Sequence, residues 1–177
     1  MNSMSTTQLL SNFLAALLPI WNVMVAFIAL LGILLVGFGL YSAGRMYSPN
    51  SKVGKSGVIA GVIVGSLMVN ISFFLNFMSY TVFNKASSSG ISYTSSQTGA
   101  MGLYLEVAMG IIAIVGLWSL TRGLYLIKDV GEDKRNLWHG VTHILGGIMA
   151  INMSAVFLLI GATVGGVVQT LTRLVTG

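Results

Sequence analysis

Ionisable side chains within apolar stretches are the first candidates for chemistry in this chain. Glu106 is the one acidic residue close to the interior of a long apolar run, and carboxylates at membrane depth serve proton relays in carriers. It also lies within about one turn of the expected helix start, where the helix dipole and headgroup water favour an anion. Two interpretations stay open for Glu106: a transport role, or anchoring and pairing with Lys85 or Arg173.

Two histidines have the spacing of residues on one helix face. His139 and His143 are four residues apart, and Glu132 or Asp133 are candidates to complete a metal site. The residues between the histidines include no glutamate to act as the base of a metallohydrolase. We therefore predict packing or interfacial roles for both histidines, with pH sensitivity at this helix end, and no metal site.

Gly54-Lys55-Ser56 has the ending of a phosphate-binding loop but not the rest of it. Pro49 occupies the position where that loop requires its first glycine, and no strand precedes it. Lys55 is better explained as a charge that sets topology or binds lipid headgroups. Because no other catalytic signature is present, the sequence predicts neither an enzyme nor a cofactor, apart from a structural phospholipid.

A third group of residues has the pattern of contacts between membrane helices. Gly57, Gly61 and Gly65 repeat every four residues, so on a helix they form a stripe that lets another backbone come close. Asn70 and Asn152 occupy matching places in two apolar runs, each within an Asn-x-Ser sequence. We predict that both asparagines form interhelical hydrogen bonds, worth about 0.6 to 2 kcal/mol each.

The composition identifies the environment in which these residues work. Of the 177 residues 55% are hydrophobic and only 7% are charged, and mean hydropathy is +0.87. Soluble domains carry about 25% charged residues, so this chain is predicted to be an integral membrane protein. Nine Lys and Arg residues spread over several loops do not make a nucleic-acid-binding face, and the absence of cysteine excludes disulfides and thiolate metal sites.

The apolar runs predict an all-α protein with four transmembrane helices at residues 20–43, 57–83, 102–126 and 139–175. Residues 1–19 are predicted to form a polar N-terminus and a short interfacial or lumen-lining helix that Pro19 interrupts. The alternative is fusion with the first span into one long kinked helix. Residues 20–84 then form a first hairpin repeat, 85–100 a Ser-rich external loop, and 101–177 a second hairpin repeat.

The basic residues predict how these hairpins are oriented. Seven of the nine lie in the two hairpin turns, and the opposite side has only Lys85 and Arg173. Cytoplasmic loops collect Lys and Arg, which predicts cytoplasmic turns with both chain ends outside. The turn residues could set topology alone, bind anionic phospholipid, or line a channel that faces a polyanion. They are Arg45, Lys52, Lys55, Arg122, Lys128, Lys134 and Arg135.

A repeated phrase indicates that the two hairpins are copies of one another. Residues 39–45 read GLYSAGR and residues 116–122 read GLWSLTR, each closing the first apolar run of its hairpin. Both phrases have the form Gly-Leu-aromatic-Ser-x-x-Arg. We predict an internal duplication in which Arg45 and Arg122 mark equivalent corners of two like-oriented hairpins.

Two apolar helices joined by a short basic turn resemble the conjugative pilin of type IV secretion systems, here repeated at residues 39–45 and 116–122. The four spans and the repeated phrase also resemble the small polytopic membrane proteins of the type IVB apparatus, of the DotE/IcmC and TraQ set. The second turn departs from the pilin pattern because Asp129, Glu132 and Asp133 dilute its basic charge, and no leader is evident.

The resemblance implies a structural, self-assembling homo-oligomeric subunit in a bacterial inner membrane, or in an extracellular pilus built from it. The implied partners are phospholipid, other membrane proteins of the machine, and single-stranded DNA or protein passing through without sequence-specific binding. Two alternatives stay open: a static channel component of the same machine, and a small transporter that uses Glu106.

Overall fold

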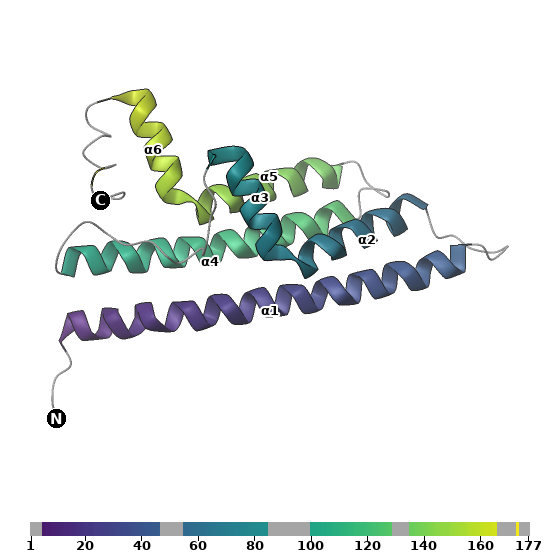
Figure 1. Cartoon of the computed structure of the whole chain (residues 1–177), viewed down its shortest axis with the longest axis horizontal. Coiled ribbons are helices and arrows are strands. Elements are labelled where there is room, and N and C mark those ends of the chain that lie inside the picture. The colour runs from purple at the N-terminus through teal and green to yellow at the C-terminus, as the bar shows by residue number, and fades with distance from the viewer. Residues whose placement is uncertain (1–4, 47–54, 85–99, 129–134, 166–172, 174–177) are drawn as a thin grey trace.

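The computed structural model describes residues 5–46, 55–84, 100–128, 135–165 and 173 of the chain. This described part is all-helical (Figure 1). Its helices, in chain order, are α1 (Thr6–Met46), α2 (Lys55–Val69), α3 (Ile71–Phe83), α4 (Ala100–Lys128), α5 (Arg135–Ile151) and α6 (Met153–Val164).

The helices differ in whether they are able to cross a membrane alone. Both α1 and α4 are long and apolar enough to do so. The α2–α3 and α5–α6 pairs meet the same test only when each pair is taken together, and their axes bend by 90° and 87° at the break. By length and composition the described residues thus provide two membrane-spanning helices, or up to four if each bent pair is one span.

Helix α1 does not end at Pro19. The sequence predicts a separate interfacial helix up to this proline, whereas α1 is one helix of 41 residues that contains it, as in the fused alternative. Proline removes one backbone hydrogen bond, but Leu17 and Trp21 are buried on either side and hold both turns against the bundle. At 1.5 Å per residue α1 is about 60 Å long, roughly twice the hydrocarbon thickness of a bilayer.

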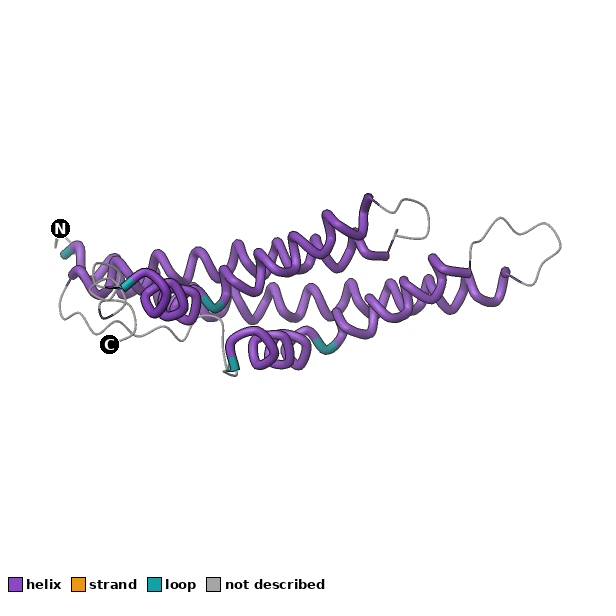
Figure 2. Tube along the Cα trace, turned by 90° about the horizontal axis from the view of Figure 1, so that it is seen from above, coloured by secondary structure: helices purple, strands orange, loops and turns teal. Residues whose placement is uncertain are grey.

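The described helices form two hairpins that point the same way. Helix α2 returns antiparallel along α1, and α5 returns along α4, while α1 and α4 run in the same direction (Figure 1). Seen from above, α3 and α6 are viewed nearly end-on, because both turn away from the long helices on the same side (Figure 2). The core lies between the hairpins and includes Ile28, Met68, Leu117 and Ile148.

Glycines bring the two helices of each hairpin into backbone contact. A methyl group at Gly32 would lie 2.7 Å from the carbonyl oxygen of Gly65, and one at Gly65 would lie 2.9 Å from that of Gly32. In the second hairpin the reciprocal distances between Gly116 and Gly147 are 2.8 and 2.6 Å. Both distances are too short for any side chain, so the pairs Gly32–Gly65 and Gly116–Gly147 are matching crossing points.

A second set of contacts fixes how the hairpins correspond. A methyl group at Gly39 would lie 2.7 Å from a side-chain carbon of Val62, and one at Gly123 would lie 2.7 Å from a side-chain carbon of Ile144. Gly32 and Gly39 therefore correspond to Gly116 and Gly123. Residues 28–41 and 112–125 align without a gap, and share Ile, Ala, Gly, Gly, Leu and Tyr at six positions.

This correspondence corrects the predicted one. The repeated phrase sets Gly39 beside Gly116, whereas the contacts set Gly39 beside Gly123, seven residues later. Seven residues are almost two helical turns, so Gly116 and Gly123 lie on the same face of α4. The spacing of glycines alone therefore does not decide which of the two corresponds to Gly39. Arg122 consequently corresponds to Phe38, and Arg45 and Arg122 are not equivalent corners.

Each hairpin breaks at the asparagine that the sequence singles out. The dihedral angles φ and ψ are −112° and 49° at Asn70, and −105° and 39° at Asn152, outside the helical range. Each asparagine N–H still donates to the carbonyl four residues before it, and each carbonyl accepts from the amide four residues later. Asparagine suits such a position because its side chain competes with helical backbone bonds. The predicted second and fourth spans are therefore bent.

Candidate functional site

The ends of four helices gather basic residues at one end of the bundle. Helices α1 and α4 finish there and α2 and α5 begin there (Figure 1). Arg45 and Lys55 are exposed, Lys128 is half-buried as the last residue of α4, and Arg135 is the first residue of α5. We call Arg45, Lys55 and Lys128 the basic end. Lys52 and Lys134 of the same predicted turns lie outside the described residues.

Two members of the basic end lie over tyrosines at corresponding positions. The Arg45 guanidinium carbon is 5.9 Å from the centre of the Tyr41 ring, and Lys128 Nζ is 4.6 Å from that of Tyr125. Such cation–π contacts are worth about 0.5–1 kcal/mol at exposed sites. The two tyrosines belong to a shorter repeat, Gly-Leu-Tyr, at residues 39–41 and 123–125. This shorter repeat, and not the seven-residue phrase, predicts the correspondence of Tyr41 with Tyr125.

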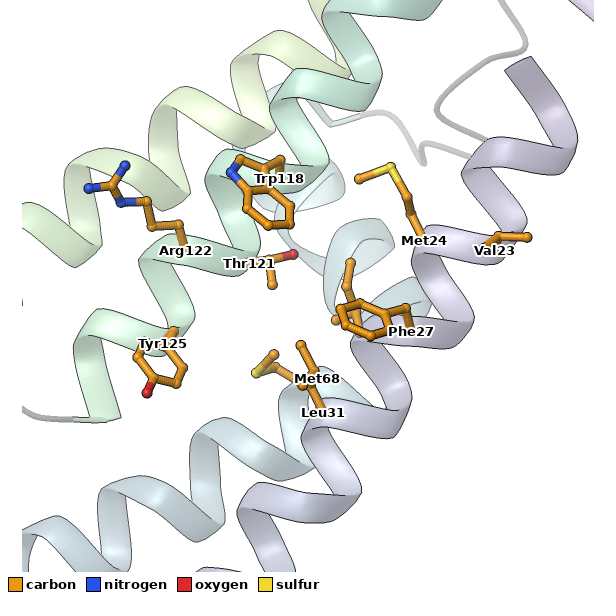
Figure 3. A pocket seen from close by; sticks show the side chains of 10 residues that line it. Val23, Met24, Phe27, Leu31, Met68, Trp118, Thr121, Arg122 and Tyr125 are labelled. Atoms are coloured by element: carbon orange, nitrogen blue, oxygen red, sulfur yellow. The ribbon is translucent and has the colours of Figure 1, made fainter. Parts of the chain in front are cut away.

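Arg122 lies apart from the basic end, beside a cavity between α1 and α4. The cavity holds about 400 Å³ and Met68 of α2 lines it from below. Figure 3 shows Trp118, Thr121 and Tyr125 on the α4 side and Phe27 and Leu31 on the α1 side. The complete lining is Val23, Met24, Phe27, Ile28, Leu31, Met68, Trp118, Thr121, Arg122 and Tyr125.

The walls of this cavity are apolar, and its one charged side chain is at the margin. The Thr121 hydroxyl donates to the carbonyl oxygen of Leu117 at 2.8 Å, which satisfies it within its own helix. The Arg122 side chain is exposed, and its guanidinium points away from the cavity (Figure 3). Such an arrangement suits a ligand with an alkyl chain inside and an anionic group outside, the chemistry of a phospholipid.

The predicted helix-packing residues separate into two groups. Asn152 Nδ2 donates to Ser79 Oγ at 2.8 Å and to the carbonyl oxygen of Ile148 at 2.9 Å. Ser79 is fully buried on α3, so this hydrogen bond joins the end of α5 to a different helix, the kind of contact predicted for Asn152. Asn70 is exposed and makes no side-chain capping bond.

The glycine stripe of α2 does not face a single partner. Gly65 touches α1, as described above. A methyl group at Gly61 would lie 3.9 Å from Cγ of Lys128, so Gly61 faces α4, and nothing lies within 4 Å of the same position at Gly57. The three evenly spaced glycines therefore have different environments: Gly65 contacts backbone, Gly61 contacts a side chain, and Gly57 has no neighbour at this position.

The second hairpin contains a polar contact between α4 and α5 that the sequence did not predict. Ser119 Oγ on α4 donates to the carbonyl oxygen of His143 on α5 at 3.1 Å, and also lies 3.1 Å from His143 Nδ1. The donor and acceptor roles in the second contact depend on which ring nitrogen of His143 carries the proton. His143 is therefore half-buried between α4 and α5, while His139 is exposed.

The remaining candidates do not join this arrangement. Glu106 is half-buried in the second turn of α4, and it is not among the residues that line the cavity. Within the described residues there is no group of three or more His, Cys, Asp and Glu side chains that could hold a metal ion. Glu132 and Asp133 lie outside that part of the chain.

Comparison of the chain with protein-family models, with curated proteins and with solved structures gives no match. The features of the chain that bear on its function are two like-oriented hairpins, the basic end, and the apolar cavity beside Arg122.

Proposed function

We propose that this chain is a structural, self-assembling membrane subunit of a bacterial conjugation or type IV secretion apparatus, a pilin built as a double hairpin. The observation that carries self-assembly is the duplication itself. Two copies of one hairpin lie side by side in the same orientation, joined through apolar helix faces. A chain of this kind is two linked members of a larger array. The type of machine comes from the resemblance in the repeated basic hairpin.

The exposed surface supports a protein that meets lipid and its own copies. Large apolar side chains cover the outside of the long helices, among them Phe38 at 67% exposed and Trp118 at 61%. Apolar surface of this extent is covered in a membrane by lipid tails or by neighbouring proteins. The basic end would then face anionic headgroups, or a polyanionic cargo such as single-stranded DNA, on the cytoplasmic side.

Phospholipid is the proposed occupant of the cavity between α1 and α4. An acyl chain would fill the apolar space lined by Phe27, Leu31 and Met68, and the phosphate would meet the Arg122 guanidinium outside it. Each Lys or Arg near a membrane surface contributes about 1 kcal/mol to binding anionic lipid. The lipid is structural in this proposal, and no catalytic step is assigned to any residue.

The test of self-assembly uses the full chain purified from bacterial membranes in mild detergent. Its oligomeric mass is measured by light scattering, and the same material and the cell surface are imaged by electron microscopy. A multimer is expected, and labelled chain within extracellular filaments supports the pilin. Label confined to the membrane assigns the chain to a static channel component, and a monomer at all concentrations contradicts the self-assembly proposal.

The lipid proposal has its own arm in the same preparation. Retained phospholipid is counted by native mass spectrometry in the wild type, in Arg122→Gln and in Arg45→Gln. Arg122→Gln is expected to lose most of the anionic lipid that survives purification, because Arg122 borders the cavity. Arg45 does not line the cavity and would face only the bulk headgroups that detergent removes, so Arg45→Gln is expected to retain that lipid. Equal retention by both variants would contradict this binding site.

A further inference from the structure

The two repeats are joined by surfaces that have distinct roles. Helix α4 of the second repeat presents Leu117, Thr121 and Leu124, which are 0%, 8% and 2% exposed. Helix α2 of the first repeat contributes Val64 and Met68, which are 2% and 1% exposed. We call the α4 surface the inserting face and the α1–α2 surface that receives it the receiving face.

Contacts between α2 and α4 give the register of this joint. Gly61 lies opposite Lys128, since a methyl group at Gly61 would be 3.9 Å from Cγ of Lys128. Helices α2 and α4 run antiparallel (Figure 1). One turn further along, Val64 therefore lies opposite Leu124.

The first repeat has its own inserting face, and it is uncovered. The α1 residues that correspond to Leu117, Thr121 and Leu124 are Ile33, Gly37 and Leu40 under the glycine correspondence. Ile33 is 57% exposed and Leu40 is 61% exposed, and nothing lies within 4 Å of a methyl group placed at Gly37. The same helix face is thus buried in one repeat and bare in the other.

The second repeat likewise has a receiving face that is uncovered. Gly146 of α5 corresponds to Val64 and is exposed, with nothing within 4 Å of a methyl group placed there. Asn152 and Asn70, which occupy corresponding positions in the two repeats, also differ in whether they are covered. Asn152 bonds to Ser79 across the joint, while its counterpart Asn70 is exposed.

We propose that the bare inserting face on α1 of one copy docks on the bare receiving face of α4 and α5 of a second copy, repeating the joint between the two repeats. This inference rests on the self-assembly proposed above and names the surface that mediates it. The occupant is a second copy because this chain already carries both halves of the joint, one at each side. Leu40 of one copy then lies opposite Gly146 of the next, as Leu124 lies opposite Val64 within the chain.

The geometry of such a contact has two consequences. Each copy offers one face of each kind, so the contact is head-to-tail and continues from copy to copy as a ring or an open helical array. Because the two repeats share one orientation, every added copy keeps the same direction across the membrane. The assembly therefore needs no copy to invert.

Disulfide trapping in membranes tests the proposed joint, and the chain has no native cysteine to interfere. Leu40→Cys and Gly146→Cys are combined in one chain, and copper phenanthroline is the oxidant. Both positions are exposed within the chain, so neither substitution disturbs its packing. The control combines Phe38→Cys with Gly146→Cys, because Phe38 is 67% exposed and lies about 200° around the helix from Leu40.

A ladder of disulfide-linked multimers is expected from Leu40→Cys/Gly146→Cys, at least tenfold more abundant than from the control. Each single-cysteine variant is expected to stay unlinked, and mixing the two single variants is expected to give dimers that contain one of each. Homodimers from either single variant would indicate a two-fold contact and overturn the head-to-tail joint, as would equal ladders from test and control. If wild-type protein is multimeric and no ladder forms, this joint fails while self-assembly stands; if wild-type protein is monomeric, both fail.

Discussion

At the scale of residues, glycine has different effects at neighbouring positions of the same helix. Gly147 lies against the α4 backbone, with a methyl group there 2.6 Å from the carbonyl oxygen of Gly116, while nothing lies within 4 Å of the same position at Gly146. A methyl group at Gly147 would therefore clash with α4, whereas a methyl group at Gly146 would point into open space.

This contrast predicts the stability of two matched variants. Gly147→Ala should destabilise the chain by about 1–3 kcal/mol, because α4 and α5 must separate to admit the methyl group. Gly146→Ala should be neutral or slightly stabilising, since alanine is the better helix former. Unfolding in mixed micelles followed by circular dichroism measures both, and equal stability of the two variants would show that α4 and α5 are not in backbone contact.

The hydrogen bond between Asn152 and Ser79 predicts an energetic coupling across the two repeats. Asn152→Ala and Ser79→Ala should each destabilise the chain, and the double variant should lose less than the sum, by about 0.6 to 1.7 kcal/mol. Asn70→Ala with Ser79→Ala is the matched control and should be additive, because Asn70 is exposed. A coupling as large in the control as in the test pair would contradict the assigned bond.

At the scale of elements, the breaks after α2 and α5 decide what each predicted second span is. Helix α2 has 15 residues and α5 has 17, which at 1.5 Å per residue is about 22 and 25 Å, short of a 30 Å hydrocarbon core. The chain then turns by about a right angle, and α3 and α6 continue as separate helices. An apolar run of sufficient length is thus divided by one asparagine in each hairpin.

Distance measurements between spin labels test the bend. Labels at Ser56→Cys and Val82→Cys should lie about 28 Å apart if the axes meet at a right angle, and about 39 Å apart if α2 and α3 form one straight helix. Ser11→Cys and Gly37→Cys have the same separation in sequence within the continuous α1 and should give the longer distance. A long distance for both pairs would remove the bend.

At the scale of the whole molecule, the hairpins form one body whose basic residues gather at one end. The last residues of α1 and α4 and the first residues of α2 and α5 lie at that same end (Figure 1). This places Arg45, Lys55 and Lys128 together although the chain brings them from three different helices. The excess of basic residues predicts that this end of the bundle faces the cytoplasm.

Labelling with a membrane-impermeant maleimide measures that orientation. Cysteines at Ser56 and Leu137, at the starts of α2 and α5, should be protected in intact spheroplasts and become reactive in inverted vesicles. A cysteine at Ser5, just before α1, should show the opposite pattern, because α1 is longer than the bilayer is thick. Labelling of Ser56 and Leu137 from opposite sides would contradict a like orientation of the hairpins.

The sequence by itself predicted membrane association, helices and two hairpins, because hydrophobicity and charge are additive along the chain and need no knowledge of contacts. It also predicted a hydrogen-bonding role for Asn152. The tertiary structure alone decided that Gly39 corresponds to Gly123, that Asn70 and Asn152 mark sharp breaks, and that Pro19 does not end α1. These features depend on which helix faces meet, and a pattern that repeats every seven residues fits two registers equally well until the packing selects one.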